Sequence, residues 1–193
     1  MGLIGALGAG PVAIDTVAFV YAGDLWLASA KGGDARRLTS DAGMEYFPKF
    51  SPDGRWIAFS AEYSGTRQVH VIPAAGGTPR QLTYYSDVGP MPVRGGTDYR
   101  VLDWTPDGKQ VLVRANRVPS DERGRRPYLV PVEGGLETPL VIPESGAGSL
   151  SPDGTGLAWL SWDHPRMPWQ GSDLWLATLD SAGRPRGTRH VAG

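Results

Sequence analysis

The sequence predicts an all-β protein, a β-propeller of four-stranded antiparallel blades with about four blade-equivalents. Two observations predict this fold. One tetrapeptide, Ser/Thr-Pro-Asp-Gly, occurs three times, at residues 51–54, 105–108 and 151–154. Each copy is followed at once by a short apolar run, and a turn that returns at intervals of about 50 residues is typical of propeller blades. In addition, the pentapeptide Asp-Leu-Trp-Leu-Ala occurs at both 24–28 and 173–177, which indicates an internal repeat.

The first blade is incomplete in the sequence. Its second, third and outer strands are expected at 17–21, 24–30 and 35–39. An inner strand is missing unless residues 3–14 provide it. Residues 1–10 are apolar and glycine-rich, and three interpretations stay open for residues 1–14: a tag, a disordered end, or the first inner strand. The chain therefore divides into an N-terminal segment, 1–14, and a single propeller domain or half-propeller, 15–193.

The other three blades each show four strands in the same order. In the second blade, short β-branched and aromatic runs are expected to form strands at 44–50, 56–60, 68–72 and 80–83. The third blade repeats them at 99–104, 110–114, 128–132 and 138–142. The fourth repeats them at 147–150, 156–161, 173–179 and 188–192. The apolar spacing of a helix is absent throughout, so we expect no helix.

The repeated tetrapeptide has a complete structural explanation. Proline presets φ, aspartate bonds a nearby backbone N–H, and glycine takes the positive φ that closes the turn. The preceding serine or threonine ties its hydroxyl into the same turn. Three aspartates could suggest a metal site, but they fall one per blade. We therefore interpret all nine residues as structural: Pro52, Asp53, Gly54, Pro106, Asp107, Gly108, Pro152, Asp153 and Gly154.

Four blades are at the low end of the range for propellers. Two arrangements follow. The chain closes on itself as a narrow four-bladed ring, or its open ends pair with a second copy in a homodimer that completes a larger ring. A stable open fragment is the least expected case, because an uncovered blade face is apolar.

Composition excludes several classes of function. Hydrophobic residues make up 40% of the chain and seven are tryptophans, enough to fill a core. A net charge of −1 argues against a nucleic-acid partner. The absence of cysteine excludes disulfides, thiolate nucleophiles and cysteine-ligated zinc, and it fits a cytoplasmic location without establishing one. The chain has no apolar run of membrane-spanning length and no convincing signal peptide, so we expect no membrane partner. We also expect no cofactor and no metal.

Two loops carry the candidate binding residues. The connection after residue 114 is locally basic and could bind carboxylates or phosphates in bidentate fashion through Arg117, Arg123, Arg125 and Arg126. The structural alternative is a solvated loop. The second loop follows residue 161 and contains Trp162, Asp163, His164 and Trp169. A metal site there would need more converging ligands, so a loop packed by its own aromatic residues is the simpler interpretation.

Longer motifs resemble known families. The motifs at 19–26, 35–39, 47–54 and 104–108 resemble the N-terminal six-bladed propeller of tricorn-protease homologues, over about residues 15–154. TolB-type propellers share the Pro-Asp-Gly turn but match less closely. From about residue 156 onward, the stretch 157–169 looks like the propeller of prolyl-oligopeptidase-type serine peptidases. A change of family near the third turn suggests a chimera or an engineered chain.

The resemblance implies a role without catalysis. In both families the chemistry resides in other domains, and the propeller is implied to filter or channel peptides. No Gly-x-Ser-x-Gly elbow occurs in this sequence, so no catalytic residue carries over. The leading expectation is a non-catalytic scaffold or a protein- or peptide-interaction module, engineered from peptidase propeller segments. The alternative is the substrate-gating propeller domain of a larger tricorn-like or prolyl-oligopeptidase-like peptidase, excised from it.

Overall fold

The computed structural model describes residues 15–84, 99–116, 125–142, 146–161, 173–180 and 183–192, and every regular element in them is a β-strand. The strands form four antiparallel sheets, one of three strands and three of four. Each sheet is one blade, so the predicted all-β propeller with about four blade-equivalents is confirmed. Within the described residues there is no helix of the length and apolarity that crossing a membrane requires.

Strand order along the chain is also the order within each sheet. Blade 1 contains β1 (Thr16–Tyr21), β2 (Asp24–Ser29) and β3 (Arg36–Arg37). Blade 2 contains β4 (Glu45–Phe50), β5 (Trp56–Ala61), β6 (Gln68–Pro73) and β7 (Arg80–Gln81). Blade 3 contains β8 (Tyr99–Trp104), β9 (Gln110–Asn116), β10 (Arg125–Pro131) and β11 (Thr138–Pro139). Blade 4 contains β12 (Gly148–Leu150), β13 (Gly156–Ser161), β14 (Asp173–Leu179) and β15 (Pro185–Ala192).

The three Pro-Asp-Gly turns share one pattern of hydrogen bonds. In blade 2, Ser51 Oγ donates to Asp53 Oδ1 (2.6 Å), and the same carboxylate oxygen accepts from the Arg55 N–H (3.0 Å). The Trp56 N–H donates back to Ser51 Oγ (3.0 Å). These bonds recur in blades 3 and 4, and the three glycines take φ values of 71°, 69° and 73°. Each turn is therefore closed by its own hydroxyl, carboxylate and N–H groups.

Apolar residues fill the seams between successive blades. We call the face of a blade that points to the next blade along the chain its front face, and the opposite face its rear face. The seam between blades 1 and 2 buries Ala18, Leu25 and Leu27 against Ile57, Phe59 and Ile72. The seam between blades 2 and 3 is centred on Val69, Val71, Tyr99, Val111 and Val113. The seam between blades 3 and 4 is centred on Leu112, Leu129, Leu157 and Trp159.

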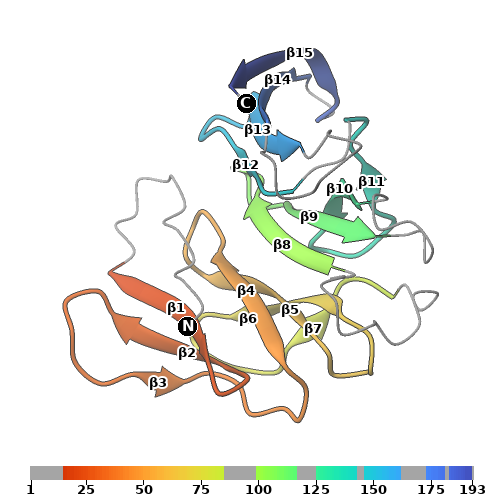
Figure 1. Cartoon of the computed structure of the whole chain (residues 1–193). Coiled ribbons are helices and arrows are strands. Elements are labelled where there is room, and N and C mark those ends of the chain that lie inside the picture. Colours follow the sequence, from red (N-terminus) through yellow and green to blue (C-terminus); the bar gives the residue numbers. More distant parts are fainter. Residues whose placement is uncertain are drawn as a thin grey trace.

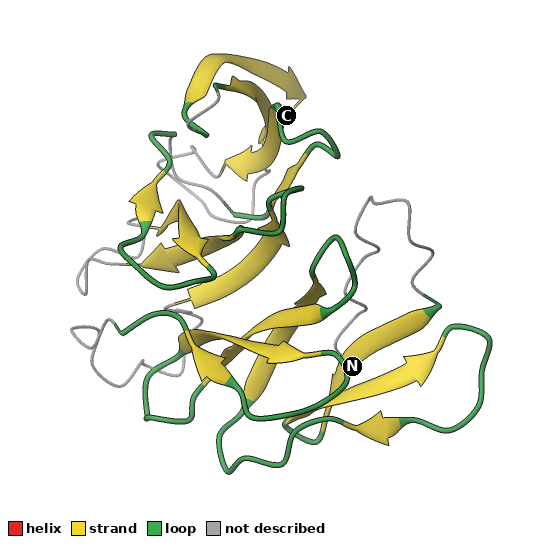
Figure 2. Cartoon of the chain, turned by 180° about the vertical axis from the view of Figure 1, so that it is seen from behind, coloured by secondary structure: helices red, strands yellow, loops and turns green. Residues whose placement is uncertain are grey.

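The described blades form an open arc. Blade 1 contacts blade 2 through β1 and β4, blade 2 contacts blade 3 through β4 and β8, and blade 3 contacts blade 4 through β8 and β12. Blades 1 and 4 lie at opposite ends of this arc (Figures 1 and 2). The described strands therefore do not form a narrow closed ring of four blades. Each end of the arc presents one blade face to which no described blade is packed.

Candidate functional site

Few of the binding residues predicted from sequence lie within the described residues. Arg126 is exposed at the start of β10, where it is paired in register with Ala115. Arg125 precedes it in the same strand, opposite Asn116. The remaining candidates lie outside the described residues and stay predictions: Arg117, Arg123, Trp162, Asp163, His164 and Trp169.

Arg100 and Arg114 lie at the same end of blade 3 as Arg126 but on the opposite face, because Arg126 pairs in register with Ala115. The sequence named Arg114 only as the start of the basic connection, and it did not single out Arg100. Arg100 in β8 and Arg114 in β9 are register partners, so their side chains leave the same face of blade 3. Arg114 is buried and donates to the carbonyl of Gly146 in blade 4 (3.0 Å). Arg100 is partly buried with its guanidinium 4.4 Å from the centre of the Phe47 ring, and burial lowers its pKa. This end of blade 3 therefore carries Arg100 and Arg114 on one face and Arg126 on the other.

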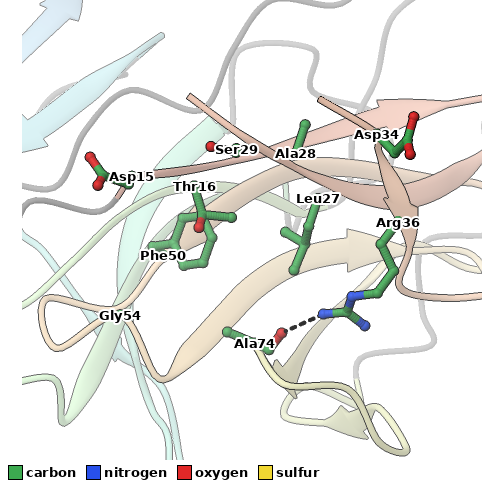
Figure 3. Close-up of a pocket in the computed structure, with 10 residues that line it drawn as sticks. All are labelled: Asp15, Thr16, Leu27, Ala28, Ser29, Asp34, Arg36, Phe50, Gly54 and Ala74. Carbon is green, nitrogen blue, oxygen red and sulfur yellow. Dashed lines mark hydrogen bonds between the residues drawn. The ribbon is translucent and has the colours of Figure 1, made fainter. Parts of the chain in front are cut away.

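A cleft of about 460 Å³ opens between blades 1 and 2, at the end of the seam that carries the Pro-Asp-Gly turn (Figure 3). Leu27 and Phe50 supply its apolar surface, and Arg36 spans the seam by donating to the Ala74 carbonyl (3.1 Å). Two carboxylates, Asp15 and Asp34, also line it. None of the ten lining residues is a histidine or a cysteine. The lining of this cleft therefore holds no thiolate nucleophile and no histidine base.

The other end of the same seam contains a buried carboxylate. Glu45, at the start of β4, is fully buried and accepts from the Leu25 N–H (2.7 Å) and from Thr39 Oγ1 (2.6 Å) of blade 1. Its second oxygen accepts a short hydrogen bond from the Tyr63 hydroxyl. Burial raises the pKa of Glu45 despite these three donors. Burial also raises the pKa of Tyr63.

Further polar groups surround this carboxylate. Asp24 forms an ion pair with Arg37 (2.7 Å), and Arg37 also donates to the Thr39 carbonyl (2.8 Å). The centre of the His70 ring lies 4.8 Å from the centre of the Tyr63 ring, and burial lowers the pKa of His70. Because Glu45 itself is covered by protein on all sides, we interpret the group as a polar lock between blades 1 and 2.

The turn aspartates are satisfied locally. The hydrogen bond from Ser51 lowers the pKa of Asp53 to about 2, and the one from Ser151 does the same for Asp153. Among the described residues, no three or more histidine, cysteine, aspartate or glutamate side chains cluster as metal ligands would.

Comparison with known proteins identifies the family. The family model described as the tricorn protease N-terminal beta propeller domain matches residues 7–186. The chain belongs to this family. The match runs through the third Pro-Asp-Gly turn, where the change of motifs had suggested a junction between two families, and no comparison supports a chimera.

Two curated relatives come from Streptomyces coelicolor. Tricorn protease homolog 1 is 33% identical over 126 residues, which are 65% of this chain and 11% of that protein. A second tricorn-protease homologue of this organism is 44% identical over 93 residues, which are 48% of this chain and 7% of that protein. This tricorn-type propeller chain therefore spans about a tenth of the length of the curated relatives that it matches.

Solved structures share the fold. The tricorn protease superposes with a TM-score of 0.71 at 21% identity, over 94% of this chain and 18% of that one. A TolB-type protein from Agrobacterium tumefaciens superposes with a TM-score of 0.72 at 20% identity, over 99% of this chain and 62% of that one. Both the expected tricorn-like and the expected TolB-like resemblance are thus confirmed.

Proposed function

We propose that this chain is a non-catalytic propeller segment of a tricorn-type peptidase, and that it holds and guides peptides for a catalytic part elsewhere. One observation carries the proposal: the family match covers residues 7–186, nearly the whole chain, and belongs to a domain that precedes the rest of the peptidase. The relatives are about ten times longer than the stretch that matches. The lining of the described cleft between blades 1 and 2 holds no thiolate nucleophile and no histidine base, which agrees with this role.

Peptides have one group that this chain is suited to recognise, the terminal carboxylate. Arginine binds carboxylates through paired, charge-assisted hydrogen bonds. Arg126 is exposed at the start of β10, and the basic connection predicted from sequence joins β9 to β10 at this end. We therefore place the peptide carboxylate at this end of blade 3.

Fluorescence anisotropy with two labelled decapeptides tests the proposal. One peptide has a free C-terminal carboxylate and the other, of the same sequence, is amidated. We expect the free acid to bind about tenfold more tightly, since one charge-assisted hydrogen bond contributes about 1.5–3 kcal/mol. Arg126→Ala should remove that preference, whereas Arg55→Ala, an exposed arginine on the turn of blade 2, should keep it. Equal affinity for the two peptides would contradict the placement.

Peptide cleavage is the second readout. We expect both peptides to be intact by mass spectrometry after prolonged incubation with the chain. Cleavage that copurifies with the chain and disappears with a serine-directed reagent would replace the scaffold role by an enzymatic one.

A further inference from the structure

Arg100 is a partly buried arginine whose guanidinium has no polar partner in the structure. The guanidinium carbon lies 4.4 Å from the centre of the Phe47 ring, and no hydrogen bond or ion pair joins this guanidinium to any residue that the structure describes. Arg67 and Arg114 are also partly or fully buried, but Arg67 pairs with Glu62 (2.5 Å) and Arg114 donates to a backbone carbonyl of blade 4 (3.0 Å). The N–H donors of the Arg100 guanidinium therefore remain available to a ligand.

The carboxylates on the strands that carry this pair are already satisfied. Phe47 lies in β4 and Arg100 lies in β8, and these two strands contact each other across the seam between blades 2 and 3. On β4, Glu45 accepts three hydrogen bonds. On β8, Asp103 accepts from a hydroxyl and from an N–H of blade 4 (2.7 and 3.1 Å). Burial alone lowers the pKa of Arg100, so no described carboxylate compensates for the hydration that its guanidinium loses.

A bulge in β4 places Phe47 beside Arg100. The register of β4 with β5 is interrupted between Tyr46 and Lys49. Within this bulge Phe47 has a φ of 55°, in the left-handed region that residues other than glycine rarely adopt. A bulge changes the direction of a side chain, and strained backbone of this kind occurs mostly at binding and active sites. The rings of Tyr46 and Phe47 lie 5.9 Å apart between centres, and the Arg67 guanidinium stacks on Tyr46 as that of Arg100 does on Phe47.

The pair lies where the blades converge, away from both ends of the arc. The first strands of blades 2, 3 and 4 contact one another in turn, and in propellers the blades are arranged around a central channel. Blade 2 packs on blades 1 and 3, and blade 3 packs on blades 2 and 4. The partial exposure of Arg100 therefore does not depend on the end faces of the arc.

We propose that Arg100, held against the Phe47 ring, binds the carboxylate of an aspartate or glutamate side chain in a peptide. Stacking occupies one face of the guanidinium and leaves the N–H groups at its edge free to form two parallel hydrogen bonds with a carboxylate. The ring also fixes the orientation of the guanidinium, which reduces the entropy lost on binding.

The inference rests on the proposed peptide-binding role and adds a side-chain preference to it. The terminal carboxylate is placed at Arg126, on the opposite face of blade 3 from Arg100. An acidic side chain is the anion that a peptide supplies away from its terminus, so the two arginines recognise different groups.

Two labelled decapeptides that differ only in their central residue test the inference. Both are acetylated and amidated, so neither has a terminal carboxylate, and the central residue is glutamate in one and glutamine in the other. We expect fluorescence anisotropy to show about tenfold tighter binding of the glutamate peptide. Arg100→Gln should remove this preference. Arg55→Gln is the matched control, because it removes the same charge from an exposed side chain on the turn of blade 2, and it should keep the preference.

A second variant tests the contribution of the ring. Phe47→Leu keeps an apolar side chain but removes the aromatic face, so the preference for glutamate should fall by about threefold. Circular dichroism and thermal unfolding of each variant establish that it folds. The comparison of the two peptides on the unaltered chain needs no variant.

Equal affinity of the unaltered chain for the glutamate and glutamine peptides would overturn the inference. The proposed function would stand if the free-acid decapeptide still bound more tightly than its amidated form, and absence of both preferences would overturn it as well. Loss of the glutamate preference in Arg55→Gln as much as in Arg100→Gln would also overturn the inference, because net charge rather than a site would then explain it.

Discussion

At the scale of single residues, a threonine closes the outer strand of blades 1 and 2 in the same way. The Leu25 N–H donates to Thr39 Oγ1 (2.9 Å), and the Val69 N–H donates to Thr83 Oγ1 (2.9 Å). Each threonine hydroxyl then donates to a buried side-chain oxygen, at 2.6 Å to that of Glu45 and at 2.7 Å to that of Gln68. A buried N–H is thereby satisfied by a side chain where the strand ladder ends.

Blade 3 shows what happens when this donor is missing. The residue equivalent to Leu25 and Val69 is Pro127, which has no N–H. The position of the threonine is then occupied by Val141, which is 83% exposed. Among blades 1 to 3, the threonine is present where there is a donor to satisfy and absent where there is none.

We predict that Thr83→Val destabilises the chain by about 1–3 kcal/mol, because a buried N–H loses its acceptor and Gln68 loses a donor. Urea denaturation followed by tryptophan fluorescence measures the change. The reverse substitution, Val141→Thr, changes an exposed side chain and should stay within about 0.5 kcal/mol of the unaltered chain. Equal effects of the two substitutions would contradict the assigned role of the threonine.

The buried carboxylate of Glu45 predicts a pH dependence. Its pKa is raised above the unfolded value of 4.5, so the folded state binds more protons as the pH passes from 4.5 to the raised pKa. The contribution of protonated Glu45 is therefore fully present below pH 4.5 and is lost as the pH rises through the folded pKa. In Glu45→Gln, the amide keeps an acceptor for Leu25 and Thr39, and this loss should disappear.

The measurement is the difference in unfolding free energy between the unaltered chain and Glu45→Gln at several pH values from 4 to 8. We expect the difference to shift in favour of the glutamine variant as the pH rises. Taking a difference cancels the opposite contribution of His70, whose lowered pKa weakens the fold on acidification. A flat difference for Glu45→Gln would refute the raised pKa.

At the residue scale, the sequence predicted the contacts between residues that are close together in the chain. The turn at 51–54 was predicted because its hydroxyl, carboxylate and N–H groups lie within five residues of one another. Glu45 was not predicted as a lock, because its partners are distant in the sequence. Tyr63 lies 18 residues away in the same blade, and Leu25 lies 20 residues away and reaches Glu45 only when blades 1 and 2 pack. Arg100 was missed for the same reason: its aromatic partner, Phe47, is in another blade.

At the scale of elements, the three turns also contact one another. A Cβ atom added to Gly154 would lie 3.1 Å from Cδ of Pro106, in the turn of the preceding blade. One added to Gly108 would lie 3.9 Å from Cδ of Pro52. The tetrapeptide thus reverses the chain within a blade and also packs against the next turn along the arc.

We predict that Gly154→Ala is more destabilising than Gly32→Ala. Both glycines have positive φ, at +73° and +94°, so both substitutions strain the backbone by about 1 kcal/mol. Gly32 has no neighbour within 4 Å, whereas at Gly154 the added atom also presses on a proline ring. The difference in urea midpoint between the two variants isolates the contact between turns. Equal midpoints would mean that the turns do not support one another.

Strand positions were predicted closely where apolar runs mark them and less well at the outer edges. The outer strands β3, β7 and β11 contain two residues each, although four or five were expected. In blades 1 and 2 a threonine hydroxyl accepts from the N–H of Leu25 or Val69, so the backbone ladder with the outer strand ends early. In blade 4 the outer strand was expected at 188–192, but β15 begins at Pro185 and contains eight residues. Two bulges in its pairing with β14 absorb the irregular register, which the apolar pattern does not encode.

At the scale of the whole molecule, identical sequences acquire different environments. The pentapeptides at 24–28 and 173–177 predicted repetition, but their burial depends on which blades stand beside them. A sequence pattern specifies which side chains point to each face, and only the arrangement of blades decides which face is covered. The fold was therefore predictable from sequence, whereas the open arc and its two uncovered faces required the structure.

An open arc of blades should unfold from its ends. Each blade contacts only its neighbours, so its stability is its own plus that of its seams, and blade 4 has one seam where blade 2 has two. We predict that amides in β13 and β14 exchange hydrogen about tenfold or more faster than those in β5 and β6. Hydrogen exchange followed by mass spectrometry measures both rates in one experiment. Uniform exchange across the four blades would show that the arc opens as one cooperative unit. The missing seam would then lower the stability of all four blades equally.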